Sequence, residues 1–83
     1  MKTITLIDNR YSKEESHVVL FDLLNDKINF LSRKIQSNED RGLAVTIFEK
    51  RKSQLLNERE MLQNTLADFD DLELHITCEI QIK

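Results

Sequence analysis

The residues best suited to chemistry in this chain are His75 and Cys78, which stand three positions apart in the stretch HITC. Such a spacing suits a zinc ion when both residues lie in a turn. The surrounding sequence instead alternates apolar and polar residues, as a β-strand does, and in a strand these two side chains leave opposite faces. They cannot share a metal ion there. We therefore expect an exposed His75 and a Cys78 that acts as a small buried apolar residue.

The other groups that could support catalysis or metal binding are few. His17 is the second imidazole and Cys78 the single thiol, so a metal site would have to be assembled between subunits. Catalysis needs a nucleophile beside a base, or two carboxylates in different environments, whereas the carboxylates in NERE and DFDD are typical of a solvated helix face and a helix end. One glycine, Gly42, is too few for a glycine-rich phosphate loop. We expect no enzymatic activity, no catalytic or metal-binding residues and no cofactor.

The composition indicates one small domain, residues 1–83, built from long regular elements. The chain has one Gly and no Pro, and 40% of its residues are apolar while 33% are charged. A domain this short buries only about 60–65% of its unfolded surface, so a partner is a reasonable expectation. The single cysteine and the lack of an opening signal-peptide pattern favour a cytoplasmic protein. Its apolar runs are far shorter than the roughly 20 residues that cross a bilayer, so we expect no membrane association.

The first half of the chain predicts a strand over residues 2–8 and a helix over residues 12–36. KTITLID is rich in β-branched residues, which favour a strand. Ser12 and Glu15 have the spacing of a capping box, which starts a helix. A core-facing stripe at helical spacing follows; its members are Leu20, Phe21, Leu24, Ile28, Leu31 and Ile35. A second apolar group on this helix indicates that it needs two neighbours; its members are Val19, Leu23 and Phe30.

A turn is predicted over residues 37–42, because Gly42 is the one residue in the chain that takes a positive φ without penalty. One continuous helix through Gly42 would cost only about 1 kcal/mol relative to alanine and remains an alternative. The second helix is expected over residues 43–69. A start at Thr46, with TIFE as a second capping box, is a further option.

The second helix carries an apolar residue at every seventh position, which keeps a narrow seam toward a neighbouring helix. These residues are Phe48, Leu55, Leu62 and Phe69. Lys52 and Arg59 interrupt the seam, so short antiparallel packing against the first helix fits better than a long coiled coil. A turn near residue 40 would produce two facing pairs: Leu24 with Leu56, and Val18 with Leu62.

The most regular pattern is LELHITCEIQIK, which predicts a strand over residues 72–83 with one apolar face. That face consists of Leu72, Leu74, Ile76, Cys78, Ile80 and Ile82. Ile4 and Leu6 can extend it from the first strand. Both strands emerge at the same end of the helical hairpin, which makes antiparallel pairing the simplest topology. The predicted fold is α+β, with an antiparallel helical hairpin packed on a small antiparallel sheet in the order β-α-α-β.

A two-stranded sheet is barely stable alone and leaves two open edges. A dimer in which the last strands pair into a four-stranded sheet, covered on one face by the helices of both chains, would remove this weakness. We therefore predict a homodimer whose interface is the apolar face of residues 72–83.

Charge is distributed unevenly in this chain, whose net charge is −3. Residues 27–52 carry +4 and the remainder carries −7, which makes the bend of the expected hairpin basic. The candidate partner-binding residues are Arg33, Lys34, Arg41, Lys50, Arg51 and Lys52. The simplest interpretation is a solubilising surface, followed by an acidic protein partner. Nucleic acid comes third, because the total charge is negative and no aromatic side chain is interleaved for base stacking.

These patterns favour a small non-catalytic protein-interaction or assembly module that acts as a homo-oligomer and recruits another protein through its helical surface or sheet edge. The alternative is a nucleic-acid-associated or regulatory protein that uses the basic bend. An enzyme with a site formed between subunits is the third hypothesis.

Overall fold

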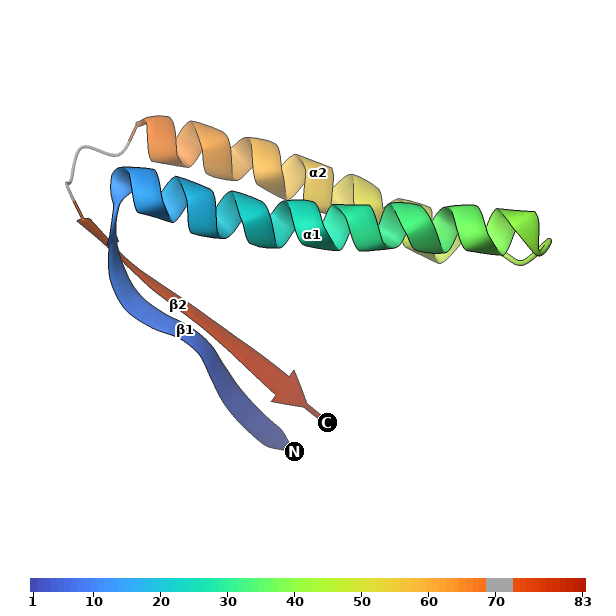
Figure 1. The fold of residues 1–83 in the computed structure, drawn as a ribbon, viewed down its shortest axis with the longest axis horizontal. Coiled ribbons are helices and arrows are strands. Elements are labelled where there is room, and N and C mark those ends of the chain that lie inside the picture. The colour runs from blue at the N-terminus through green and yellow to red at the C-terminus, as the bar shows by residue number, and fades with distance from the viewer. Residues whose placement is uncertain (69–72) are drawn as a thin grey trace.

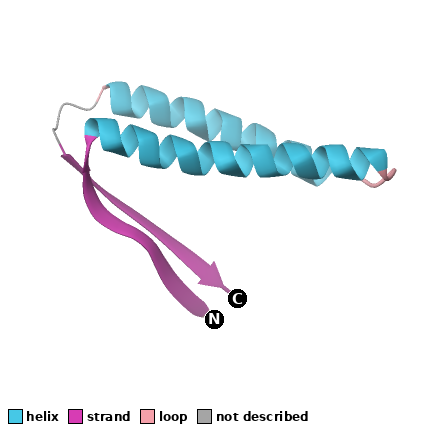
Figure 2. Ribbon diagram, viewed as in Figure 1, coloured by secondary structure: helices cyan, strands magenta, loops and turns pink. Residues whose placement is uncertain are grey.

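The computed structural model of this chain describes residues 1–68 and 73–83. Within them, the elements follow the order β1 (Lys2–Ser12), α1 (Lys13–Asp40), α2 (Thr46–Ala67) and β2 (Glu73–Ile82). The helices form a hairpin, and the strands form an antiparallel two-stranded sheet at one end of it (Figures 1 and 2). This arrangement confirms the predicted α+β class and the β-α-α-β order.

The two strands pair along nearly their whole lengths, and we call the paired strands the ribbon. The register runs from Lys2 opposite Ile82 to Ser12 opposite Glu73, with one irregularity in β1. Adjacent to the first helix, the apolar side chains of β2 reach the core. The ribbon therefore ties together the two ends of the described chain.

β1 is longer than predicted, because it ends at Ser12 and not at residue 8. The stretch DNR has residue types that favour turns, yet it stays extended. Asn9 lies opposite Ile76 and Arg10 lies opposite His75. The long regular β2 supplies these residues with backbone partners, and this pairing overrides their local preference.

The predicted capping box starts α1. Ser12 Oγ accepts a hydrogen bond from the Glu15 N–H at 3.1 Å, and Glu15 Oε1 accepts one from the Ser12 N–H at 3.0 Å. The bond from the Ser12 backbone, followed by its side-chain bond, lowers the pKa of the Glu15 carboxyl from its usual 4.5. Ser16 is fully buried and donates its hydroxyl to the Ser12 carbonyl at 2.7 Å. The strand-to-helix junction thus satisfies its buried hydroxyl within the chain.

The predicted turn over residues 37–42 begins too early, since α1 continues to Asp40. Gly42 has the expected positive φ, at 69°, and a single continuous helix is therefore wrong. The last residues of α1 stay helical because the bonds that end the helix form around Gly42 itself.

A Schellman motif ends α1. The N–H of Gly42 donates to the Glu39 carbonyl at 3.1 Å, and the N–H of Leu43 donates to the Asn38 carbonyl at 2.7 Å. The side chain of Asn38 is buried and donates Nδ2–H to the Ala44 carbonyl at 3.2 Å. These three bonds hold the loop between the helices in one conformation.

α2 begins at Thr46, the later of the two starts considered. The expected TIFE capping box does not form, because Val45 occupies the N-cap position and no side chain caps the helix. α2 ends at Ala67, and the predicted end at Phe69 lies outside the described residues.

The helices pack through the predicted seam. Ile28 of α1 and Leu55 and Leu66 of α2 are buried between them. Arg59, which interrupts the apolar spacing, donates Nη1–H to Asn25 Oδ1 of α1 at 2.6 Å. This charge-assisted hydrogen bond stabilises the packing of α1 against α2, because it gives the Arg59 guanidinium a partner within the seam.

The facing pairs expected for a turn near residue 40 were Leu24 with Leu56 and Val18 with Leu62. Val18 and Leu56 are exposed, so neither of these two side chains is buried between the helices. The hydrogen bond from Arg59 to Asn25 marks two residues of the helices that do lie side by side.

The ribbon meets the hairpin only through α1. α1 contacts both strands, whereas α2 contacts neither among the described residues. Beyond the junction, the ribbon projects away from the helices (Figure 1), and the molecule measures 48 × 32 × 15 Å. The predicted packing of hairpin on sheet therefore exists at the junction and leaves the far end of the ribbon uncovered. Neither described helix combines the length and apolar character needed to cross a membrane.

Replacing Ser12 by alanine should lower the free energy of unfolding by about 1 kcal/mol, because the first turn of α1 loses its cap. Urea titration at fixed protein concentration measures this. Ser53→Ala, at an exposed position in α2, is the control and should change stability little. Because the pKa of Glu15 is lowered, its contribution is present above its usual pKa and is lost as the pH falls through the lowered value. The difference in stability between Glu15→Gln and the wild type should therefore shrink in acid. Equal losses from Ser12→Ala and Ser53→Ala at neutral pH would contradict the role of the cap.

Replacing Gly42 by alanine should cost about 1–2 kcal/mol of unfolding free energy, the penalty of a left-handed conformation for an L-residue. Apart from Gly42 and its two chain neighbours, no described residue has an atom within 4 Å of the position that a Cβ would occupy, so the backbone conformation sets this cost. Gly42→Asn should cost less, since asparagine tolerates the left-handed region. Urea midpoints for the three proteins give the order, and an alanine variant as stable as the wild type would disprove the assignment.

Candidate interaction surface

A β-bulge in β1 determines which of its residues lie opposite the apolar side chains of β2. Ile7 lies opposite Cys78 and Ile4 lies opposite Ile80, and Leu6 is the extra residue without an opposite partner. In a regular strand, residues three apart point to opposite faces. The inserted residue returns Ile4 and Ile7 to the same face. Ile7 therefore extends the apolar face of β2 beside Ile4, and Leu6, which was also expected there, is the inserted residue and is 52% exposed.

Burial of this face decreases along β2. Ile76 is 9% exposed and Leu74 is half-buried, where α1 contacts the strand, whereas Ile80 is 41% and Ile82 52% exposed. Ile4, opposite Ile80, is exposed as well. The predicted interface is thus divided into a proximal part, which the chain covers itself, and a distal part, which it leaves open.

The other predicted residues of the last strand have different surroundings. Leu72 lies outside the described residues. Cys78 is half-buried and has a free thiol, so it is less enclosed than expected. His75 belongs to the other face, is exposed as expected, and places Nε2 2.6 Å from Asp8 Oδ1. Among the described residues, no three His, Cys, Asp or Glu side chains lie close enough to hold a metal ion.

The two outer edges of the ribbon differ. The edge of β1 is interrupted by the bulge at Leu6, and a bulge twists an edge away from further pairing. β2 has no irregularity over Glu73–Ile82, and within the described chain β1 is its one paired neighbour. Its outer edge therefore offers a regular row of backbone donors and acceptors to another strand.

The molecule exposes more surface than a compact monomer of its mass. A folded chain of 9.8 kDa is expected to expose about 5,200 Å², but this chain exposes 6572 Å². Its radius of gyration is 15.5 Å, against about 12 Å for a compact domain of this length. The excess of roughly 1,400 Å² is comparable with the area that one subunit buries in a stable homodimer.

The second apolar group of α1 is only partly covered. Val19 and Leu23 are half-buried, but Phe30, further along the same face, is 57% exposed. Ser16 is fully buried on this face as well. This face of α1 is therefore covered at Ser16, near the junction with the strands, and exposed at Phe30, further along the helix.

The six predicted partner-binding residues lie on the half of the hairpin remote from the ribbon (Figure 1). They are Arg33, Lys34, Arg41, Lys50, Arg51 and Lys52. Part of this basic bend is already engaged within the chain. Lys34 Nζ lies 5.8 Å from the ring centre of Phe48, and Arg51 Nη1 lies 3.9 Å from a Glu58 carboxylate oxygen. The bend and the exposed end of the ribbon are separate surfaces.

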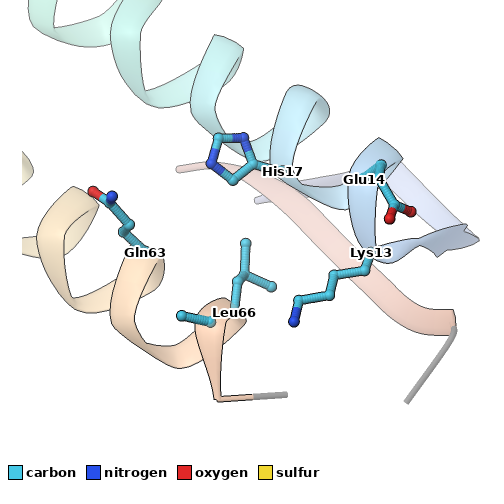
Figure 3. A pocket seen from close by; sticks show the side chains of 6 residues that line it. Lys13, Glu14, His17, Gln63 and Leu66 are labelled. Atoms are coloured by element: carbon cyan, nitrogen blue, oxygen red, sulfur yellow. The ribbon is translucent and has the colours of Figure 1, made fainter. Parts of the chain in front are cut away.

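An open pocket of about 470 Å³ lies between the start of α1 and the end of α2 (Figure 3). Its described lining consists of Lys13, Glu14, His17, Gln63, Leu66 and Ala67. Although its size suits a small ligand, none of these side chains carries a hydroxyl or thiol for nucleophilic catalysis. The His17 ring stacks on Phe21 with centroids 4.1 Å apart. In the sequence, His17 stands three residues before Leu20 and seven before Leu24, in line with the apolar stripe. The pocket itself depends on how the helix ends meet.

Comparisons with protein-family models, curated proteins and solved structures found no significant match.

Proposed function

We propose that this protein is a small non-catalytic assembly module that acts as a homodimer through its ribbon. The open distal part of the apolar face is the observation that carries this proposal. Ile4, Ile80 and Ile82 are exposed there on one face, and clusters of exposed apolar side chains mark sites of association. The excess surface of the chain is of the size that such an association removes.

The remaining surfaces fit a scaffold whose hairpins recruit a second protein. The basic bend lies far from the ribbon, so a dimer joined through its ribbons would keep both bends accessible (Figure 1). An acidic protein surface would be attracted to the bend by charge, which orients a partner even where each exposed pair contributes little affinity. Protein is favoured over nucleic acid because the chain carries a net charge of −3, which opposes binding to a polyanion.

Sedimentation equilibrium should show a dimer at micromolar concentration. Ile80→Glu should raise the dimer dissociation constant at least tenfold, because it places a charge in the apolar face at a cost above about 1.4 kcal/mol. Gln81→Glu adds the same charge on the opposite face of the strand and serves as the control. A folded wild-type monomer at this concentration, or equal effects of the two variants, would refute the proposal.

Replacing two bend residues, Arg41→Gln with Lys50→Gln, should leave the dimer intact and weaken capture of a protein partner from native cells. Capture by the wild type should survive nuclease treatment. Arg10→Gln with Lys13→Gln removes the same charge outside residues 27–52 and should leave capture unchanged. Loss of the captured material on nuclease treatment, with a steep dependence on salt, would instead support nucleic acid as the partner.

A further inference from the structure

We infer that two copies pair through the outer edges of their β2 strands, antiparallel, with the two-fold axis at Cys78. The inference rests on the proposed homodimer and adds its geometry. The occupant of the open edge is a second copy of this chain, and the pairing makes a four-stranded sheet in the order β1, β2, then the partner's β2 and β1. Three properties of the described residues select this register.

The first property is the regularity of the edge. Antiparallel pairing needs an unbroken row of alternating backbone groups. β2 provides such a row over Glu73–Ile82, whereas β1 is interrupted at Leu6. A two-fold symmetric dimer uses the same edge on both copies. The β2 edge is therefore the one that can pair with itself.

The second property is the alternation of β2. Residues directly opposite each other in an antiparallel pair point to the same face. The apolar residues of β2 all have even numbers and its polar residues have odd numbers, from Glu73 to Gln81 with Thr77 among them, and Lys83, which follows β2, continues the alternation. If the two-fold axis passed midway between two residues, each even-numbered residue of one copy would lie opposite an odd-numbered residue of the other. Every apolar side chain would then lie opposite a polar one. The axis must therefore pass through a residue, and both apolar faces then form one continuous face.

The third property is the match of burial and charge when that residue is Cys78. Leu74 then lies opposite Ile82 of the partner subunit, and Ile76 opposite Ile80 of the partner subunit. Each exposed isoleucine thereby comes next to a position that the other copy already covers with its α1. Both hairpins lie on the same face, at opposite ends of the four-stranded sheet. At the ends of the pairing, Glu73 lies opposite Lys83 of the partner subunit, and this ion pair occurs twice by symmetry.

Neighbouring registers fit less well. If the axis passes through Ile76, Glu73 of one copy lies opposite Glu79 of the other. If it passes through Glu79, the two copies of that carboxylate lie opposite each other. Like charges directly opposite are destabilising. An axis at Ile80 shortens the overlap. An axis at Thr77 keeps the apolar matches but leaves Glu73 opposite Gln81. The Thr77 axis therefore lacks an ion pair at the ends of the pairing. In the Cys78 register Glu73 forms that pair while Arg10 Nη1 of its own chain lies 4.0 Å from Glu73 Oε2.

Reversal of the end charges tests this register in the full chain. Glu73→Lys and Lys83→Glu, made singly, should each weaken dimerisation about fivefold, because each replaces two attractive pairs by two repulsive ones. The double variant, Glu73→Lys with Lys83→Glu, should restore the wild-type dissociation constant. Glu73 and Lys83 stand at opposite ends of one strand, about 33 Å apart, so recovery can arise only between subunits. High salt should reduce these differences.

A second measurement does not depend on those variants. Cys78 is the only thiol in the chain, so a short bismaleimide can join two subunits only through it. Opposite residues have Cα atoms about 4.5–5.5 Å apart, and the wild type should be cross-linked efficiently. Lys2→Cys in a Cys78→Ser background moves the thiol far from the axis and should not be cross-linked.

The outcomes separate the register from the proposed function. Recovery in the double variant together with cross-linking at Cys78 supports the inferred register. A stable wild-type dimer that shows neither overturns the register and leaves the homodimer standing. A wild-type monomer in sedimentation overturns the homodimer itself, and the register with it.

Discussion

The pairing of β1 with β2 is the constraint on which the rest of this structure depends. It joins segments far apart in the sequence, as the contact between Asp8 and His75, 67 positions apart, shows. Once the strands are paired, α1 must begin and α2 must end near the same end of the sheet. The chain must therefore reverse its direction between the two helices. Gly42 and the buried side chain of Asn38 accomplish that reversal. The hairpin is thus positioned from its base by the sheet and closed at its tip by a helix cap.

The sheet in turn depends on one inserted residue. Without the bulge at Leu6, the register of Ile4 with Ile80 would continue and place Asp8 opposite Ile76 and Arg10 opposite Leu74; with it, Asn9 and Tyr11 take those positions. The same insertion makes the β1 edge unsuitable for further pairing. One local irregularity therefore both keeps two charged residues away from the apolar face and distinguishes the two edges of the ribbon.

Local patterns predicted much of this architecture. The capping box at Ser12, the turn glycine and the alternation of the last strand each depend on residues close in sequence, and each is present. The length of β1 was underestimated because DNR resembles a turn until β2 is placed beside it. The missing capping box of α2 shows that a motif also needs its residues at the right positions of the helix, since Val45 and not Thr46 is the N-cap.

The position of the bulge and the direction of the ribbon could not be predicted from the sequence, and the reason is the same for both. The position of the bulge depends on which residues of β1 face β2, and the direction of the ribbon depends on which side of α1 meets the strands. Both are set by contacts between distant segments. Alternation along β2 identified its apolar residues correctly, but only the junction with α1 determines that Ile76 is covered while Ile82 is open.

The arrangement of the ribbon also has a kinetic consequence. Closing a flexible loop costs more entropy as the loop lengthens, about 0.6 kcal/mol for each doubling. The hairpin has short loops near Gly42, whereas the strands must meet across nearly the whole chain. We expect the two helices to pack first, starting at the turn near Gly42. The strands should pair last, once the folded hairpin has shortened the distance between β1 and β2. The terminal segments would then be the first to open in hydrogen exchange, and they would spend the longest time during folding without protected edges.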